Sequence, residues 1–319
     1  MNKAVRILNL EPLHYSANAQ AVLETLGDVT NGPLSRNELL EKIGVFDVLV
    51  TRLGHQIDKE ALNAANSLKV IVSATTGLNH IDMEVAQDKK ITILSLQGER
   101  EFLDSIHATA EHSFALIFSL YRKIPSAHQS VMNGHWDRDS FIGNELQGKK
   151  LGIIGLGRLG TKVANFAKAF DITVYAYDTN PAVSMDGIEN TSSLNEIADL
   201  CDIITIHIPS SKENKNFIAS DFFNRMKRNA ILINTSRGDV VDQVALLSSL
   251  KDKKIAAAAL DVLEEEYNGN LGTSPLIEYA RNHENLIITP HIGGATYESM
   301  HKTELFMAQK LQRFFLSQA

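Results

Sequence analysis

The chain has 319 residues, of which 44 % are hydrophobic and 22 % are charged, and its formal net charge is −7. This length exceeds that of one average domain, so we expect two domains with sizeable cores, with a single α/β barrel as the alternative. Acidic and basic residues are interspersed and no apolar run is long enough to span a bilayer, which argues against nucleic-acid and membrane partners.

The cysteine content and the first residues indicate the compartment. Cys201 is the only cysteine, so an internal disulfide is excluded, and its surroundings (ADLCDIITIH) indicate a packed junction between a helix and a strand. The opening residues, MNKAVRILNL, show neither the long apolar stretch nor the cleavage site of a signal peptide. We therefore expect a cytoplasmic protein.

Over the first hundred residues, short β-branched or apolar runs alternate with helical patterns. We predict strands at 5–10, 48–51, 70–73 and 91–95. Such alternation is typical of a parallel sheet with crossover helices.

The apolar segment 105–121, SIHATAEHSFALIFSLY, predicts a long and largely buried helix. Six further strands are predicted after it, at 151–154, 172–177, 203–208, 230–234, 256–260 and 286–289. Six strands with intervening helices make a complete doubly wound dinucleotide-binding domain, which we place at 102–290.

The remaining tail is helical and too short to form a domain, so we expect it to return to the first one. The substrate-binding domain would then be discontinuous, with residues 1–101 and 291–319. The predicted fold class is α/β, with two doubly wound parallel-sheet domains, a Rossmann domain being inserted into a flavodoxin-like domain.

The stretch LGIIGLGRLGTKVANF carries Gly155, Gly157 and Gly160 in the order G-x-G-x-x-G, between an apolar strand and a helix. In this context the first glycine permits the tight turn, the second lets the backbone approach a pyrophosphate, and the third allows close packing of helix on strand. Arg158 and Leu159 would add backbone amides at the helix N-terminus.

The next predicted strand ends at Asp178, eighteen residues after Gly160. A carboxylate there accepts hydrogen bonds from the ribose 2′-hydroxyl and repels a 2′-phosphate, and no positive charge follows to compensate. The predicted cofactor is therefore NAD rather than NADP. A turn-capping aspartate is the alternative interpretation.

Three polar residues follow predicted strands, where ligands of an open α/β sheet collect. Arg237 follows the fourth strand of the second domain, Asp261 the fifth and His291 the sixth. The arginine suits a carboxylate of the 2-oxo or 2-hydroxy type, although a solvated charge would look the same. His291 is either a core histidine or a proton acceptor.

An acidic run, Glu264 to Glu266, follows the strand that ends before Asp261. Two of these three glutamates would be solvated. One carboxylate bonded to His291 would raise the pKa of the imidazole and fix its tautomer, which makes a base suited to a hydroxyl proton near neutral pH.

Together these residues resemble the NAD-dependent D-isomer-specific 2-hydroxyacid dehydrogenases, which include D-3-phosphoglycerate, D-lactate and glycerate/hydroxypyruvate dehydrogenases. The resemblance rests on an ordered set of motifs that covers most of the chain: ATTGLNHID, ATAEHSFALIFSLYRKI, GKKLGIIGLGRLG, HIP, NTSRGDVVD, ALDVLEEE and TPHIGGAT. It implies hydride transfer between NAD(H) and a small D-2-hydroxy acid, in a cleft that closes between two domains, and commonly a homodimer formed through the cofactor domain.

The resemblance also implies a role for each motif residue. The implied catalytic residues are Arg237, Glu266 and His291. For the substrate carboxylate the implied ligands are the backbone amides of Thr76, Gly77 and Leu78. On the cofactor side the implied contacts are Asp261 to the nicotinamide carboxamide, His207 and Pro209 on the adenine side, and Thr235 of the NTSRG motif. No metal site is implied.

Two departures from the family pattern concern the cofactor side and the acidic run. The usual HxPLTxxT reads HIPSSKEN, with Ser210 and Asn214 at the family's Leu and Thr positions, and ALDVLEEEY lacks the proline common after the glutamate. Neither departure touches the Arg, Glu and His set.

The substrate is the least determined part of the prediction. Arg52, at the end of a predicted strand, is a candidate for a second anionic group of the substrate, and Arg100 and Lys123 are further candidates. D-3-phosphoglycerate is the first substrate that we expect, and glycerate/hydroxypyruvate is the next. We expect no appended regulatory domain. Formate dehydrogenase is disfavoured because it has glutamine in place of Glu266. An NAD(H)-sensing corepressor without significant turnover remains the alternative from another class.

Overall fold

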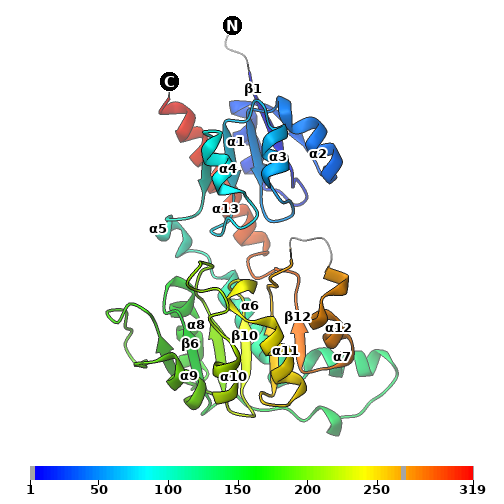
Figure 1. The fold of residues 1–319 in the computed structure, drawn as a ribbon, viewed down its shortest axis with the longest axis vertical. Helices are drawn as coiled ribbons and strands as arrows, with labels where there is room; N and C mark the ends of the chain where they lie inside the picture. Colours follow the sequence, from blue (N-terminus) through cyan, green and yellow to red (C-terminus); the bar gives the residue numbers. More distant parts are fainter. Residues whose placement is uncertain (1–3, 267–270, 319) are drawn as a thin grey trace. The chain divides into compact units, whose positions relative to one another are not determined.

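A computed structural model describes residues 4–266 and 271–318 of the chain. The chain divides into two compact units, which we describe separately (Figure 1). Unit 1 consists of Met1–Ile106 and Ala295–Ala319, and unit 2 consists of His107–Gly294.

Unit 1 contains, in its described part, a five-stranded parallel sheet in the order β2-β1-β3-β4-β5. The strands are β1 (Val5–Asn9), β2 (Gly27–Asn31), β3 (Val48–Thr51), β4 (Val70–Ser73) and β5 (Thr92–Ser95). The helices around it are α1 (Ala17–Leu26), α2 (Arg36–Lys42), α3 (Lys59–Ala64), α4 (Met83–Asp88), α5 (Arg100–Leu103) and α13 (Tyr297–Leu316), with the 3₁₀ turn η1 (Ile43–Val45).

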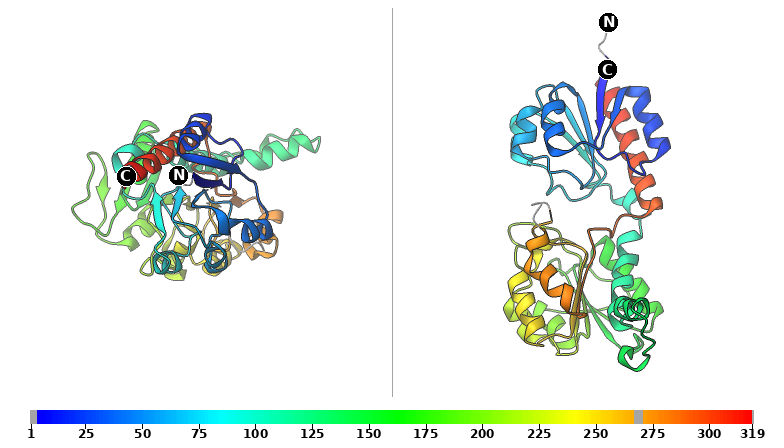
Figure 2. Two further views of the ribbon diagram at one scale, coloured as in Figure 1. Left: turned by 90° about the horizontal axis from the view of Figure 1, so that it is seen from above. Right: turned by 90° about the vertical axis from the view of Figure 1, so that its right-hand side faces the viewer.

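Both faces of this sheet are covered, which explains its sequences. Strands β3 (VLVT) and β4 (VIVS) are buried along their whole length, as expected for parallel strands between two helical layers. Met307 and Leu311 of α13 pack with Leu23 of α1 in the core on one face. Figure 2 shows these two helices side by side, although they come from opposite ends of the chain.

Unit 2 contains, among its described residues, a seven-stranded parallel sheet in the order β12-β11-β10-β9-β6-β7-β8. Its strands are β6 (Lys150–Ile154), β7 (Thr173–Tyr177), β8 (Glu189–Asn190), β9 (Ile203–Ile206), β10 (Ile231–Asn234), β11 (Ala257–Leu260) and β12 (Leu286–Ile288). Its helices are α6 (Ala108–Tyr121), α7 (Ile124–Met132), α8 (Arg158–Ala169), α9 (Leu194–Leu200), α10 (Ser220–Arg225), α11 (Gln243–Lys251) and α12 (Pro275–Asn282), with the 3₁₀ turns η2 (Asp139–Phe141), η3 (Gly238–Val240) and η4 (Leu271–Thr273).

The two sheets confirm the predicted fold class. The order in unit 1 is that of a flavodoxin-like sheet, and unit 2 has the Rossmann order with one further strand, β12, at its edge. Two strands were not predicted from the sequence: β2 and the two-residue β8. The prediction for Cys201 is confirmed, since its side chain is fully buried between the end of α9 and the start of β9.

The predicted helix 105–121 is shorter than expected, because the regular helix begins at Ala108. Its apolar character has a cause inside the unit: Phe114, Leu116 and Ile117 are buried in a core shared with α8 and the central strands. The exposed apolar residues of this unit include several on α7 and the loop after it, where Met132 is 62 % and Trp136 is 90 % exposed.

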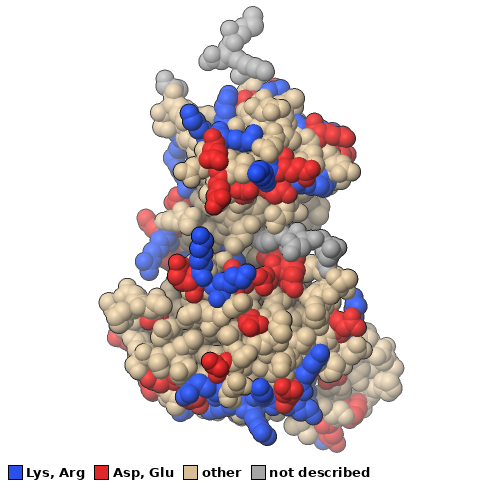
Figure 3. All heavy atoms as spheres, viewed as in Figure 1, with Lys and Arg blue, Asp and Glu red and all other residues tan. Residues whose placement is uncertain are grey.

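The surface and the helices bear on possible partners. On the face shown in Figure 3, lysine and arginine side chains are mixed with aspartate and glutamate over each unit. Within residues 4–266 and 271–318, no helix is both long and apolar enough to cross a membrane.

Candidate active site

The glycine loop of unit 2 has room for a ligand at one glycine and none at the other two. Gly155 has φ +93°, and a Cβ built there would lie 2.7 Å from Ile208 Cγ2. A Cβ on Gly160 would lie 2.2 Å from the carbonyl oxygen of Gly155. A Cβ on Gly157, the residue preceding α8, would meet no atom within 4 Å.

This arrangement fits a dinucleotide. The tight turn and the helix packing require the outer glycines, whereas only an approaching ligand gives a reason for glycine at 157. The loop leads into α8, a helix of 12 residues whose first N–H groups lack intrahelical partners and favour an anion such as a pyrophosphate. Residues 155–160 would hold the pyrophosphate.

Asp178 lies beside the same loop, directly after β7. Its Oδ2 accepts a hydrogen bond of 2.9 Å from the backbone N–H of Leu156, and its Oδ1 accepts one of 2.9 Å from Asn180 N–H. The carboxylate is therefore fixed next to the glycine turn and keeps lone pairs for further donors. Its position suits a ribose hydroxyl.

The loop after β9 packs against the glycine turn. The carbonyl oxygen of His207 would be 2.8 Å from a Cβ on Gly155. The His207 ring lies 2.9 Å from Thr205 Oγ1 through Nε2, and burial lowers its pKa to about 4, so the ring is neutral at neutral pH. Asn214 donates a hydrogen bond of 2.9 Å to the carbonyl of Pro209, so this departure from the family motif holds the loop.

Thr235 lies at the end of β10 and is buried. Its hydroxyl is 2.8 Å from that of Ser113 on α6. The contact ties α6 to the carboxyl end of the strand, immediately before the loop that carries Arg237.

His291 and Glu266 are in direct contact. His291 Nδ1 lies 3.0 Å from Glu266 Oε1, and the two side chains are 21 % and 14 % exposed. His291 has φ +53°, an unusual backbone conformation for a residue with a Cβ, and its N–H donates to the carbonyls of Asp261 and Thr289. The loop after β12 thus turns the imidazole toward the acidic run, and the carboxylate it meets is the predicted one.

The carboxylate of Asp261 holds this loop in place. It is 1 % exposed and accepts hydrogen bonds from the N–H groups of Ile292 (2.9 Å) and Gly293 (2.7 Å) and from the hydroxyl of Thr289 (2.6 Å). His112 Nε2 lies 3.3 Å from the same carboxylate and 3.1 Å from the Thr289 hydroxyl. Burial raises the pKa of Asp261, but these donors outweigh it and lower the pKa overall.

Sequence reasoning missed His112 and Thr289. His112 was part of the apolar helix, and the signal that could have singled it out is a polar ring within an otherwise buried face of α6. The contacts of Asp261 lie within the loop 289–293 and α6, so its observed role is to support the segment that carries His291.

Arg237 follows β10 in an extended backbone conformation, and Asn234 Nδ2 donates a hydrogen bond of 2.8 Å to its carbonyl. The next residue, Gly238, lies so close to the loop after β11 that a Cβ would be 2.1 Å from the carbonyl carbon of Leu263. The loop of Arg237 and the loop that ends at Glu266 are therefore packed together. The structure brings Glu266 and His291 into hydrogen-bond contact, and the Arg237 loop packs against residues 263 and 264 of the loop that ends at Glu266.

In unit 1 the predicted carboxylate ligands lie on the loop after β4. Thr75 Oγ1 donates 2.7 Å to the carbonyl of Gly77, and the carbonyl of Leu78 accepts from Ile81 N–H. Among the described residues, the N–H groups of Thr76, Gly77 and Leu78 find no acceptor. Three successive free amides form a site suited to a carboxylate.

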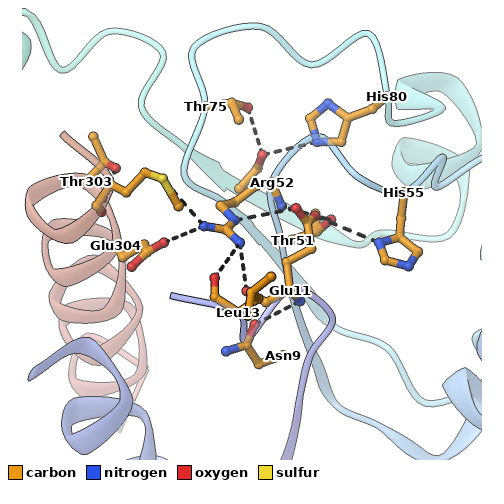
Figure 4. Close-up of polar contacts among 12 residues, drawn as sticks. Asn9, Glu11, Leu13, Thr51, Arg52, His55, Thr75, His80, Thr303 and Glu304 are labelled. Carbon is orange, nitrogen blue, oxygen red and sulfur yellow. Dashed lines mark hydrogen bonds and ion pairs between the residues drawn. The ribbon is translucent and has the colours of Figure 1, made fainter. Parts of the chain in front are cut away.

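The three cationic candidates differ in their surroundings. Arg52 follows β3 and forms ion pairs with Glu11 and Glu304 (Figure 4). Lys123 lies at the start of α7 and donates to the carbonyl of Ser140, and Arg100 is exposed at the start of α5. In the described chain, no three His, Cys, Asp or Glu side chains are arranged to hold a metal ion.

Known proteins similar to this chain are dehydrogenases and reductases. D-3-phosphoglycerate dehydrogenase of Methanocaldococcus jannaschii is 38 % identical over 97 % of this chain and 57 % of its own length, and glyoxylate reductase of Thermofilum pendens is 34 % identical over 88 % and 81 %. The chain spans about half the length of the curated D-3-phosphoglycerate dehydrogenases that it matches.

Solved structures agree with the fold. D-lactate dehydrogenase from Aquifex aeolicus, complexed with NAD and lactic acid, superposes with a TM-score of 0.82 at 26 % identity, over 98 % of this chain and 96 % of that one. An acyclic imino acid reductase in complex with NADPH and D-Arg gives a TM-score of 0.80 at 26 % identity, over 98 % of both chains.

Residues 114–293 match the model of the family described as D-isomer specific 2-hydroxyacid dehydrogenase, NAD binding domain. That match contains the glycine loop, Asp178, Arg237, Glu266 and His291, the residues around which the site of unit 2 is built. The chain belongs to the D-isomer specific 2-hydroxyacid dehydrogenase family.

Proposed function

We propose that the protein is an oxidoreductase that interconverts a small D-2-hydroxy acid and the corresponding 2-oxo acid with NAD(H). The observation that carries the proposal is the 3.0 Å contact between His291 and Glu266 at the carboxyl edge of a dinucleotide-binding sheet. The loop that ends at Glu266 packs against the loop of Arg237 through Gly238. NAD(H) supplies the hydride acceptor or donor for C2 of the acid.

The contact with Glu266 assigns the tautomer of His291. A carboxylate only accepts hydrogen bonds, so Nδ1 carries the proton that faces Glu266, and Nε2 is the nitrogen that exchanges a proton with the substrate hydroxyl. Glu266 also stabilises the imidazolium that forms when the hydroxyl is deprotonated. In the reductive direction the same nitrogen returns the proton to the carbonyl oxygen.

Arg237 would bind the substrate by its planar guanidinium, which matches a carboxylate and polarises an adjacent carbonyl. The free amides of Thr76, Gly77 and Leu78 are proposed to bind the same carboxylate from unit 1. A substrate bound in this way would present its C2 oxygen to the imidazole of His291. Orientation of this kind lowers the activation barrier of the reaction.

For the cofactor we propose NAD rather than NADP. The support is Asp178, whose carboxylate lies beside the glycine loop and would repel a 2′-phosphate. Similar proteins have been solved with either NAD or NADPH, so the preference of this chain is tested by comparing the two.

A cytoplasmic homodimer is part of the proposal. The homodimer is supported by the apolar surface of α7 and the loop after it, where Met132 and Trp136 are exposed, since such patches mark protein interfaces. Among substrates, the names of the relatives favour D-3-phosphoglycerate or glyoxylate, and the family resemblance adds glycerate/hydroxypyruvate as a candidate.

The test combines activity with cofactor binding. We expect the wild type to reduce at least one 2-oxo acid with NADH, and His291→Ala and Arg237→Ala each to lower turnover by about two orders of magnitude or more, with NADH affinity retained. Near-normal turnover in either variant would refute its role. A protein that binds NADH and reduces no 2-oxo acid would instead be a nucleotide-sensing protein of the corepressor type.

A further inference from the structure

Arg52 occupies the place in unit 1 where an open α/β sheet collects ligands. It follows β3 directly, and Glu11 lies two residues after the end of the neighbouring strand β1. The strand order reverses between β1 and β3, and the crevice beyond the carboxyl ends of such a pair is the usual ligand site. A guanidinium there would suit the phosphate group of a substrate.

The nitrogens of Arg52 already face acceptors, as Figure 4 shows. Nη1 lies 3.0 Å from Glu304 Oε1, and Nη2 donates to the carbonyls of Glu11 (3.0 Å) and Leu13 (3.2 Å). Nε is 3.4 Å from the Glu11 carboxylate. The Arg52 side chain is 19 % exposed, so little of it is presented to solvent.

Glu304 is fixed by contacts on both of its oxygens. It lies on α13, its side chain is fully buried, and Oε2 accepts a hydrogen bond of 2.7 Å from the N–H of Ser16, the residue that caps α1. An Arg52 that turned toward a ligand would leave this buried carboxyl group without its cationic partner, which is strongly unfavourable. Glu304 thus holds the guanidinium where it is.

Glu11 offsets the charge of Arg52. Burial raises the pKa of Glu11, but the contacts with His55, Arg52 and Thr51 outweigh it and lower the pKa to about 2, so the carboxylate is ionised at neutral pH. Its Oε1 accepts from the backbone N–H of Arg52 at 2.7 Å and lies 3.9 Å from His55 Nδ1. A phosphate dianion placed at Arg52 would therefore meet carboxyl groups on two sides of the guanidinium.

We propose that Glu304 and Glu11 commit Arg52 to the structure of unit 1, and that the 2-oxo acid substrate of this chain carries no phosphate group. The inference rests on the proposed function and narrows its substrate class. A two- or three-carbon acid whose only anionic group is its carboxylate needs one anion site. The carboxylate ligands proposed above, the amides after β4 and the Arg237 guanidinium, do not include Arg52.

The first test compares three acids in the wild type with NADH: glyoxylate, hydroxypyruvate and 3-phosphohydroxypyruvate. Hydroxypyruvate and its phosphate ester differ only in the phosphate group, so the ratio of their kcat/KM values isolates it. We expect the unphosphorylated acid to be favoured by at least about tenfold, since placing a phosphate group next to carboxylates of like charge costs more than that. A ratio near one, or in favour of the ester, overturns the proposal.

The second test removes a negative charge that pairs with Arg52, so that the guanidinium becomes available to a phosphate group. Glu304→Gln removes one carboxylate, and its amide oxygen still accepts a hydrogen bond from Arg52 or from Ser16. We expect the ratio of kcat/KM values to move toward 3-phosphohydroxypyruvate by about tenfold. Glu41→Gln, an exposed residue of α2 with the same change of charge, serves as the control and is expected to leave the ratio unchanged. A ratio unchanged in Glu304→Gln, with a melting temperature like that of the wild type, overturns the role given to Glu304.

A binding measurement separates this inference from the proposed activity. Calorimetric titration of the NAD-loaded wild type with D-glycerate and with D-3-phosphoglycerate is informative even where no acid is turned over. Absence of turnover with every acid refutes the proposed function. Equal or tighter binding of the phosphorylated acid refutes the inference, and weaker binding supports it.

Discussion

The open space at Gly157 leads to a sharp prediction for Gly157→Ala. The residue has φ −77° and ψ −161°, which any L-residue adopts, and the new methyl group meets no protein atom within 4 Å. Alanine at a compatible position stabilises by about 0.4–1 kcal/mol through the unfolded chain, whereas alanine is a poorer N-cap than glycine by a similar amount. We therefore expect the melting temperature to stay within roughly 4 °C of the wild type.

Cofactor binding should respond quite differently. The methyl group would occupy the place where the backbone approaches a pyrophosphate, and overpacking of a close contact costs about 1–3 kcal/mol. This corresponds to an NADH affinity lowered by about 5- to 150-fold, measured by fluorescence titration. Gly272→Ala, on η4 and likewise with an open Cβ position, is the control that should change neither quantity. Wild-type NADH affinity in a folded Gly157→Ala protein would refute the cofactor assignment of the loop.

Three further predictions concern buried polar groups. Asp261→Asn leaves at least one of the N–H groups of Ile292 and Gly293 without an acceptor. We therefore expect the free energy of unfolding by denaturant to fall by about 1–3 kcal/mol and kcat to fall by about a hundredfold. Asp221→Asn, at an exposed position of α10, is the control, and an unchanged kcat in Asp261→Asn would refute the supporting role of Asp261. Burial lowers the pKa of His207 to about 4 from an ordinary value of 6.5, so the contribution of the neutral ring to stability is complete above pH 6.5 and is lost as the pH falls toward 4. His207→Gln should therefore flatten the dependence of the unfolding free energy on pH between 4 and 6.5. The same slope in the variant and the wild type would contradict the prediction. Burial raises the pKa of the Cys201 thiol to about 12. Iodoacetamide at pH 8 should therefore label Cys201 only after the protein has been unfolded in urea. Rapid labelling of the native protein would show that the thiol is accessible.

The sequence predicted best the strands that are buried on both faces. β3, β4, β9 and β10 each bury four consecutive residues, and such continuous apolar runs stand out from their surroundings. β2 (GDVTN) and β8 (EN) lie at sheet edges and are largely exposed, so no hydrophobic pattern marks them. Their pairing depends on the neighbouring strand and not on their own residues.

The same distinction holds for the site. The glycine loop could be predicted because its residues follow a strand in a short motif whose chemistry is local. The positions after neighbouring strands predicted that His291 meets one of the three glutamates, and only the resemblance to the family singled out Glu266. The pairing of Arg52 with Glu304 joins residues 252 positions apart, and the contact of Ser113 with Thr235 joins residues 122 apart. Such pairs depend on how the helices lie on the sheet, which no local pattern encodes.

Unit 1 is assembled from both ends of the chain, and this has a consequence for synthesis. Its strands leave the ribosome before unit 2, but Met307, Ala308 and Leu311, which complete the core around Leu23, are made after unit 2. At about 5–20 residues per second, the apolar side of α1 waits uncovered for on the order of ten seconds or more while the intervening unit is translated. The nascent chain therefore exposes an apolar surface to chaperones during that interval. Unit 2 also has time to fold before unit 1 is complete.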